Sequence, residues 1–395
     1  MIGGGPAGLR AAEVAALGGG NVTVYDAMRS VGRKFLVAGK SGLNLTNGEA
    51  FPAFLDHYGG AELPNALWKQ ILTSFDNQRL REWASGLGIE TFVAGSGKVF
   101  PVPVDGMIKA APLLRRWVER LRSLGVTFQT GHRWSGLDDD RRLTFHSGSG
   151  DVTDQPDAVI LALGGASWPQ TGSTGTWTSI LEAKGIRVTP LRAANCGWEV
   201  DWPKALLAEA EGLPLKNLQL KAGKVSRRGE LVITNYGLEG GPIYHLGPAL
   251  RAMTAPEVVV DFKPDRSVEE LADRFGNVTR NFVREARRRW KLDAATCALL
   301  KHLPDRGPWK NAEQLAREVK HCRIPLTGPR PVAESISTAG GVCWSEIDDR
   351  LMIKKLPGVF VAGEMIDWEA PTGGYLLQGC FATGTHVGKA ALHWE

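Results

Sequence analysis

Apolar runs interrupted by glycine mark both ends of the chain. Residues 9–17 form an Ala-rich apolar run that predicts a helix, and residues 21–26 predict the strand that follows it. Residues 157–166 and 358–364 are continuous apolar stretches with glycine at or near their ends, as in parallel strands buried on both faces. After Gln378 the pattern predicts a terminal Gly- and Ala-rich helix. Both ends therefore predict alternating strands and helices of the α/β class.

The first half of the chain contains amphipathic and alternating segments between these runs. Apolar positions three or four residues apart predict helices at 68–87 and 107–124. Short runs rich in β-branched and aromatic residues predict extended structure between the helices. The predicted strands lie at 88–93 and 125–129, with a hairpin at 95–103 and a meander over 142–153.

The pattern changes after about residue 190. Short strand-like pieces predict a small β-rich module, and longer periodic segments predict helices beyond it. A loop is expected at 337–342, because this segment contains two adjacent glycines. The expected strands are 196–200, 213–222, 230–234 and 258–262, and the expected helices are 267–290 and an interrupted piece over 299–319.

Composition narrows the class of protein. The chain has 395 residues, 43% hydrophobic and 23% charged, which is ordinary for a globular protein of two or three domains. No apolar run approaches 18 residues, so we expect neither a membrane span nor a signal peptide. The five cysteines include no C-x-x-C pair and the eight histidines show no metal-binding spacing, so we expect a cytoplasmic protein without a metal site.

The first nine residues carry the most informative motif. Gly3, Gly5 and Gly8 form G-x-G-x-x-G before the predicted helix, as in loops that bind a pyrophosphate at a helix N-terminus. Asp26 ends the next predicted strand, 18 residues beyond Gly8, near the ~20 expected for a carboxylate that binds ribose hydroxyls. An ordinary glycine-rich turn is the alternative. Only two residues precede Gly3, so the first strand is either truncated or unusually short.

A basic loop follows Asp26. Residues 39–41 read Gly-Lys-Ser, but the leading glycine of a P-loop is replaced by Lys34, so we exclude a nucleotide triphosphatase. Arg33 or Lys34 is expected to neutralise a phosphate, and Asn44 and Thr46 to form hydrogen bonds with it. A solvated basic loop is the alternative interpretation.

The strand ends in the second half indicate a long cofactor. Glu364 follows an apolar strand and is placed to bind polyol hydroxyls. The segment 373–375 is expected to pass beside a flavin ring, with the following helix N-terminus pointing at its pyrimidine end. NAD would need only the first βαβ unit, whereas a second ligand-type strand end near the C-terminus favours FAD.

The chain resembles the BaiN/YhiN-like flavoprotein family, also known as the aminoacetone-oxidase family of FAD-binding enzymes. The motifs that carry the resemblance are Gly3–Gly8, Gly32-Arg33-Lys34, 39–47, 163–175, 338–342 and 362–378. The resemblance implies a Rossmann-like, glutathione-reductase-like FAD-binding domain at 1–189 and 333–395. It also implies an inserted β-barrel-like module at 190–265 with 320–332, and a helical module at 266–319.

From these motifs and the resemblance we expect a set of cofactor-binding residues and assign no catalytic residue. Many family members carry a cysteine in the loop around 40–44 and a histidine in the segment that here runs 234–242, and this chain has neither. The expected cofactor-binding residues are Gly3, Gly5, Pro6, Ala7, Gly8, Asp26, Ala27, Arg33, Lys34, Asn44, Leu45, Thr46, Arg133, Gly164, Gly165, Gly340, Gly363, Glu364, Gly373, Gly374 and Tyr375.

The expected function is that of an FAD-dependent oxidoreductase. Its unidentified small organic substrate would bind between the FAD domain and the insert. The single dinucleotide motif means that NAD(P)H, as electron donor, would bind only transiently. A flavin-dependent RNA-modifying or RNA-binding protein is the alternative, because of the basic run 284–291, and a flavin-binding sensor without turnover is a third hypothesis. Aromatics are not interleaved with those charges, so we expect a solvated face and no nucleic-acid partner.

Overall fold

The computed structural model describes residues 1–39, 42–103, 106–303 and 307–394. The chain divides into two compact units, Met1–Arg192 with Ser337–Glu395 (unit 1) and Ala193–Ile336 (unit 2). Each unit has a hydrophobic core of its own. Unit 2 is therefore an insertion into a unit that contains both chain ends. The exact domain limits and a separate helical module at 266–319 stay predictions.

A parallel sheet with the order β5–β1–Ile2–β9–β19 forms the centre of unit 1. Its central strand is reduced to the bridges that Ile2 makes with Tyr25 and Leu161. The Ile2 N–H donates to the Ile160 carbonyl (2.9 Å), and the Ala162 N–H donates to the Ile2 carbonyl (2.8 Å). The strands are β1 (Thr23–Asp26), β5 (Thr127–Thr130), β9 (Val159–Leu161) and β19 (Val359–Val361).

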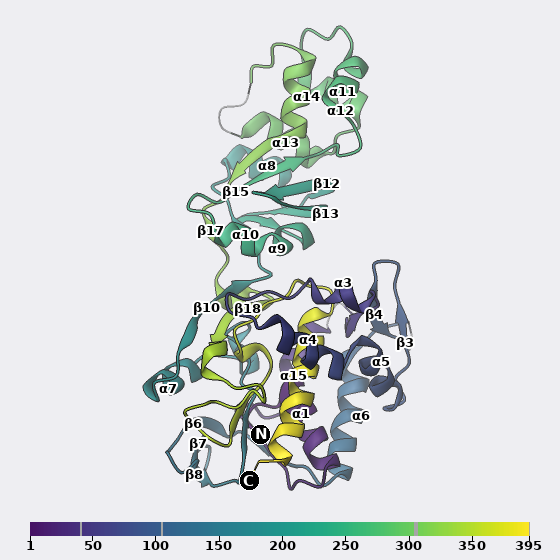
Figure 1. Cartoon of the computed structure of the whole chain (residues 1–395). Coiled ribbons are helices and arrows are strands. Elements are labelled where there is room, and N and C mark those ends of the chain that lie inside the picture. Colours follow the sequence, from purple (N-terminus) through teal and green to yellow (C-terminus); the bar gives the residue numbers. More distant parts are fainter. Residues whose placement is uncertain (40–41, 104–105, 304–306, 395) are drawn as a thin grey trace. The chain divides into compact units, whose positions relative to one another are not determined.

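Two helices from opposite ends of the sequence pack against each other beside this sheet. They are α1 (Pro6–Leu17) and α15 (Tyr375–Leu392), labelled next to each other in Figure 1. A Cβ at Gly384 would lie 2.4 Å from the Ala7 carbonyl oxygen, and one at Gly388 would lie 2.8 Å from that of Ala11. Both glycines therefore allow a backbone-to-backbone approach that a larger residue would prevent. The predicted first and last helices are confirmed.

The other elements of unit 1 follow the sequence predictions with three exceptions. The basic loop expected after Asp26 is wrong in part, because Arg33–Ala38 form a helix. The helix predicted at 68–87 is wrong as one piece, because it breaks at Phe75 and Asp76 caps a second helix by accepting from the Arg79 N–H (2.8 Å). The loop predicted at 337–342 is wrong too, since this buried segment pairs as a strand with β10.

The remaining unit 1 elements are α2 (Arg33–Ala38), β2 (Thr46–Asn47), α3 (Phe51–Leu55), α4 (Asn65–Ser74), α5 (Asn77–Ser85), β3 (Thr91–Val93), β4 (Lys98–Pro101), α6 (Ala110–Ser123), β6 (Arg133–Leu137), β7 (Leu143–Ser147), β8 (Gly150–Asp154), α7 (Trp177–Ala183), β10 (Val188–Ala194) and β18 (Ser337–Val342).

Unit 2 is built on a seven-stranded sheet with the order β16–β15–β12–β13–β14–β11–β17. Its pairings run from one edge to the other, and no pairing among the described residues joins β16 to β17, so the expected closed barrel is not confirmed. The helix predicted at 267–290 is wrong as one piece, because Gly276 (φ 63°) follows the end of α11. The elements are β11 (Trp198–Glu199), α8 (Lys204–Ala210), β12 (Pro214–Ala222), β13 (Val225–Thr234), β14 (Gly237–Glu239), α9 (Gly241–His245), α10 (Gly247–Arg251), β15 (Glu257–Asp261), α11 (Val268–Phe275), α12 (Phe282–Trp290), α13 (Ala294–His302), α14 (Ala312–Lys320), β16 (Cys322–Pro325) and β17 (Gly328–Pro329).

Two features that bear on function are absent from the described residues. None of their helices has the length and apolarity that crossing a membrane requires. They also contain no group of three or more His, Cys, Asp or Glu side chains arranged to hold a metal ion.

Candidate functional site

The three motif glycines have different surroundings. Gly3 has φ 102°, and a Cβ there would lie 2.3 Å from the Ala162 carbonyl oxygen. A Cβ at Gly8 would lie 2.0 Å from the Gly3 carbonyl oxygen, whereas one at Gly5 would have no atom within 4 Å. Gly3 and Gly8 are therefore required by the turn and by helix packing. Gly5 borders open space, as expected where a ligand approaches the backbone.

The N-terminus of α1 borders the same pocket, which Pro6 and Ala7 line. The first hydrogen bond of the helix runs from the Leu9 N–H to the Gly5 carbonyl (2.9 Å), which leaves the N–H groups of Ala7 and Gly8 outside the helical ladder. Pro6 has no N–H, and none of the described side chains caps the helix. These donors and the positive end of the helix dipole favour an anion such as a phosphate.

Asp26 is fixed at the end of β1 by two backbone donors. Its Oδ2 accepts from the Gly4 N–H (2.9 Å) and its Oδ1 from the Met28 N–H (2.8 Å). Burial raises the pKa of this carboxyl, while the two N–H donors and the charge of Arg33 act in the opposite direction. Each carboxylate oxygen keeps a further acceptor position, so the pair of ribose hydroxyls predicted from the sequence can be accommodated.

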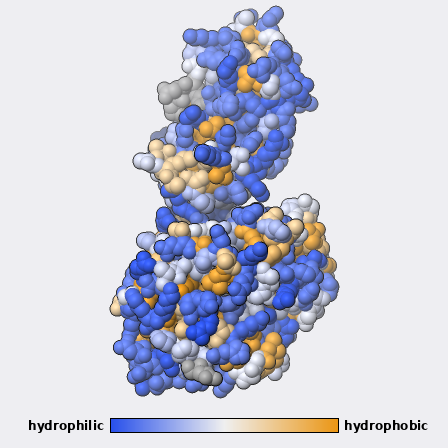
Figure 2. All heavy atoms as spheres, viewed as in Figure 1, coloured by the Kyte–Doolittle hydropathy of each residue, from blue (hydrophilic) through white to orange (hydrophobic). Residues whose placement is uncertain are grey.

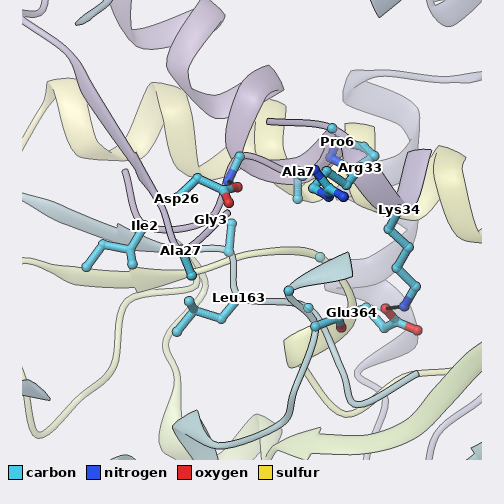
Figure 3. A pocket seen from close by; sticks show the side chains of 18 of the residues that line it. Ile2, Gly3, Pro6, Ala7, Asp26, Ala27, Arg33, Lys34, Leu163 and Glu364 are labelled. Atoms are coloured by element: carbon cyan, nitrogen blue, oxygen red, sulfur yellow. Dashed lines mark hydrogen bonds and ion pairs between the residues drawn. The ribbon is translucent and has the colours of Figure 1, made fainter. Parts of the chain in front are cut away.

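Lys34 and Glu364 form an ion pair in another part of the pocket. Lys34 Nζ lies 2.8 Å from Glu364 Oε2 and donates to Ser167 Oγ (2.6 Å), and Figure 3 shows the two charged side chains pointing toward one another. Glu364 Oε1 accepts from the Thr338 N–H (2.9 Å). Lys34 thus already has a carboxylate partner. The exposed Arg33 makes no hydrogen bond or ion pair with the described residues and remains available for a phosphate.

These groups line one pocket of unit 1, shown in Figure 3. Sequence reasoning missed His132 and Trp134 and selected Arg133 between them. Successive side chains of an extended chain point to opposite faces, so Arg133 points away from the face on which His132 and Trp134 lie. The sequence alone allows this inference. The pocket is lined by Ile2, Gly3, Gly4, Gly5, Pro6, Ala7, Tyr25, Asp26, Ala27, Gly32, Arg33, Lys34, His132, Trp134, Ala162, Leu163, Gly164, Thr171, Gly172, Ser173, Ala362, Gly363, Glu364 and Cys380.

Several other expected contacts lie outside this lining. A Cβ at Gly374 would lie 2.4 Å from the backbone carbonyl carbon of Thr46, and one at Gly340 would lie 2.4 Å from the Pro190 carbonyl oxygen. Chain crowding alone therefore accounts for these two glycines. The expected residues that do not line the pocket are Gly8, Asn44, Leu45, Thr46, Arg133, Gly165, Gly340, Gly373, Gly374 and Tyr375.

Thr46 and Tyr375 have protein partners instead. Thr46 Oγ1 donates to the buried Gln378 (2.7 Å), and the Tyr375 hydroxyl donates to Glu49 Oε2 (2.8 Å). The Tyr375 ring centroid lies 4.2 Å from that of His57. The flavin contact expected for 373–375 stays a prediction, and Lys40 and Ser41 of the neighbouring loop lie outside the described residues.

A buried polar atom supports a ligand in this pocket. Trp134 Nε1, on a pocket-lining side chain, is buried and has no hydrogen-bond partner among the described residues. Asn44 Oδ1 is buried and unpartnered in the same way, but Asn44 lies outside the pocket lining. Because an unsatisfied buried polar group costs about 1–3 kcal/mol, such atoms are normally paired. Together with the open side of Gly5 and the α1 N-terminus, the unpaired Trp134 indole fits a dinucleotide in the pocket.

Comparisons with known proteins agree with this geometry. The family model of the HI0933-like protein Rossmann domain matches residues 1–390. A 3-dehydro-bile acid delta(4,6)-reductase of Clostridium scindens is 27% identical, with 99% of this chain and 98% of the relative covered. A ribosomal RNA dihydrouridine synthase of Haemophilus influenzae is 24% identical, with 96% of this chain and 94% of the relative covered.

Solved structures share the fold. A 3-ketosteroid delta1-dehydrogenase of Sterolibacterium denitrificans superposes with a TM-score of 0.56 at 12% identity, covering 100% of this chain and 99% of that one. A flavocytochrome c3 fumarate reductase gives a TM-score of 0.52 at 14% identity, covering 99% of this chain and 77% of the other. At such identities these likenesses concern the fold alone.

Proposed function

Because this chain belongs to the HI0933-like Rossmann-domain family, matched over residues 1–390, we propose that it is an FAD-dependent reductase of carbon–carbon double bonds conjugated with a carbonyl group. The names of the two curated relatives share this chemistry. A delta(4,6)-reductase of a 3-dehydro-bile acid saturates bonds conjugated with the 3-keto group, and dihydrouridine forms when the C5–C6 bond of a uracil ring is reduced.

The observation that carries the proposal is the open side of Gly5 between the α1 N-terminus and Asp26. The N–H groups of Ala7 and Gly8 and the Arg33 guanidinium would bind the diphosphate of FAD, and Asp26 the adenosine ribose. Glu364, held by Lys34 and the Thr338 N–H, would bind the ribityl hydroxyls. Bound FAD would supply two-electron hydride chemistry, while the protein orients it and excludes water.

The electron donor is part of the proposal. The sequence has one dinucleotide motif, which the cofactor would occupy, so we propose that NAD(P)H binds transiently and leaves before the substrate is reduced. Anaerobic stopped-flow mixing with NADH and with NADPH tests this step. Rapid loss of the oxidised flavin absorbance is expected with one of the two, and no loss with either would rule out a nicotinamide donor.

The substrate class is tested with the reduced enzyme. Photoreduced, FAD-loaded protein is mixed anaerobically with a 4-ene-3-keto steroid and, in parallel, with its saturated 3-keto counterpart. Reoxidation by the unsaturated compound alone supports the proposal. If both fail, the same enzyme is incubated with uridine-containing RNA and dihydrouridine is measured by mass spectrometry. Oxidation by dioxygen alone, with no reduction of either conjugated substrate, would indicate an oxidase and contradict the proposal.

A further inference from the structure

The net charge of the chain is concentrated in one short segment of unit 2. Residues 280–291 contain six arginines and lysines and one carboxylate, a net charge of +5, and the whole chain also has a net charge of +5. All other residues therefore sum to zero. The cations are Arg280, Arg284, Arg287, Arg288, Arg289 and Lys291.

Helix α12 (Phe282–Trp290) arranges these residues with one buried and one cationic face. Ala286 and Trp290 are buried, and the indole N–H of Trp290 donates to the Leu271 carbonyl (2.9 Å). Arg284, Arg287 and Arg288 are exposed and lie three and four residues apart, so they share the opposite face at spacings of about 6 Å. Figure 2 shows mostly hydrophilic residues over the part of unit 2 where Figure 1 labels α11 and α12.

The one carboxylate of this segment, Glu285, pairs with two of the arginines and leaves the other cations without a counter-charge inside the segment. Glu285 Oε2 accepts from Arg288 Nη2 (2.9 Å) and Arg289 Nε (3.2 Å). Arg284 and Arg287 form no ion pair with the described residues. We call the exposed Arg284, Arg287 and Arg288 the α12 arginine face.

Helix stability does not account for this arrangement. Cations in the last turn favour the helix dipole, which covers Arg287 and Arg288, but Arg284 lies in the first turn, where a cation is unfavourable. Like charges three or four residues apart also destabilise a helix by about 0.2–0.5 kcal/mol per pair. The face therefore has an electrostatic cost in the free protein that a polyanion would relieve.

We propose that the α12 arginine face, flanked by Arg280 and Lys291, is a docking surface for the phosphate backbone of RNA. Guanidinium groups form bidentate hydrogen bonds with phosphates, and several on one face track a phosphate chain. The inference rests on the proposed function, because a uracil ring of the bound RNA would then carry the conjugated double bond. It agrees with the names of the relatives that act on ribosomal RNA, and it revises our expectation of a merely solvated face.

The surroundings of α12 favour RNA over a membrane surface. A helix that lies in a lipid interface needs an exposed apolar stripe beside its cations. Here the apolar side packs inside unit 2, where the rings of Phe275 and Phe282 stack with centroids 5.6 Å apart and Ala286 is fully buried. A membrane that contains anionic lipid would therefore contact only the cations of α12 and would gain no apolar contact.

The binding experiment uses the full-length, FAD-loaded protein and a fluorescein-labelled, uridine-containing RNA hairpin. Fluorescence anisotropy is measured between 50 and 200 mM salt for the native protein and for Arg284→Glu/Arg287→Glu/Arg288→Glu. Three lost phosphate contacts should weaken binding more than tenfold at 150 mM salt and lower the slope of log K against log salt by about 2–3. The matched control Lys69→Glu/Arg115→Glu/Arg122→Glu changes the net charge by the same amount as the α12 variant, but on exposed residues of unit 1. This control should leave the slope unchanged.

Three outcomes would overturn the inference: no RNA binding by the native protein, equal losses in both triple variants, or a loss of binding to phosphatidylglycerol vesicles with RNA binding intact. The neutral variant Arg284→Gln/Arg287→Gln/Arg288→Gln, with unchanged thermal unfolding, guards against misfolding and should show the same loss of salt dependence. Reduction of the 4-ene-3-keto steroid is measured in each protein. If the native protein reduces the steroid but binds no RNA, only the docking surface is refuted. If it binds RNA but does not reduce the steroid, the reduction of free enones is refuted.

Discussion

At the scale of single residues, identical glycines serve different purposes. Gly3 and Gly8 are crowded by backbone atoms, whereas Gly5 borders the open pocket. A sequence pattern shows all three alike. Substitution distinguishes them, because added bulk at a crowded glycine disturbs folding and added bulk at Gly5 disturbs only what binds there.

Gly5→Val is expected to yield folded protein without flavin. A Cβ at this position has no atom of the described residues within 4 Å beyond its chain neighbours, so the valine is accommodated on the side from which a diphosphate would approach. Flavin absorbance and thermal unfolding are the measurements. Gly95→Val, at another glycine without neighbours within 4 Å, is the matched control and should keep FAD. Full FAD occupancy in Gly5→Val would refute the assignment of the loop.

Asp26→Ala is expected to weaken FAD binding by about 1–3 kcal/mol, the range for losing a charged hydrogen-bond partner. Asp26→Asn keeps one acceptor oxygen and should lose less. Isothermal titration of the apo-protein with FAD gives the dissociation constants. If all three proteins bind equally, Asp26 serves only to hold the loop through Gly4 and Met28.

Cys380 is expected to resist alkylation well above neutral pH. Burial raises the pKa of its thiol to about 12, so little of the reactive thiolate forms at pH 9. Iodoacetamide labelling followed by mass spectrometry should show fast modification only after denaturation. The raised pKa also makes the free energy of unfolding depend on pH. The thiol loses its proton near pH 9 in the unfolded chain and near pH 12 in the folded protein. This group therefore stabilises the fold below pH 9, and that contribution declines as pH rises toward 12. Fast labelling of the native protein would contradict a raised pKa for this partly exposed, pocket-lining thiol.

At the scale of elements, contact between α1 and α15 depends on small residues. Gly384→Val would place side-chain atoms against the Ala7 carbonyl and separate the two helices. We expect a loss of about 1–3 kcal/mol or more in unfolding free energy, together with weaker FAD binding, because α1 carries the phosphate-binding end. Chemical denaturation measures the first quantity. Unchanged stability would mean that the two helices can move apart without cost.

The elements around the site could largely be predicted, and the failures share physical causes. The apolar runs that became β1, β9, β19 and α15 were predicted because burial on both faces leaves an unambiguous pattern. Arg133 was expected at the cofactor, whereas the pocket is lined by His132 and Trp134 on either side of it, because neighbouring positions of an extended chain face opposite ways. Gly340 and Gly374 were expected at the cofactor and stay predictions, because a glycine that admits a ligand and one that admits a neighbouring chain look the same in sequence.

At the scale of the whole molecule, two separate cores predict a local response to the cofactor. All residues that line the pocket belong to unit 1. Saturation with FAD at 100 times its dissociation constant should stabilise the folded state that binds it by about 2.7 kcal/mol. Hydrogen exchange should therefore slow in α1 and β1 while β12 and β13 exchange as before. Equal slowing in both units would show that they unfold together.

The contact between α1 and α15 also sets an order of events during synthesis. The phosphate-binding loop leaves the ribosome before unit 2, whereas the helix that packs on Ala7 and Ala11 leaves after the whole of unit 2. Domains generally fold as their chains emerge, so unit 2 can form its core while the glycine loop still lacks its support. A ribosome-bound chain that ends before residue 375 should therefore contain a folded insert and bind no flavin, which makes cofactor capture a late step in the making of this protein.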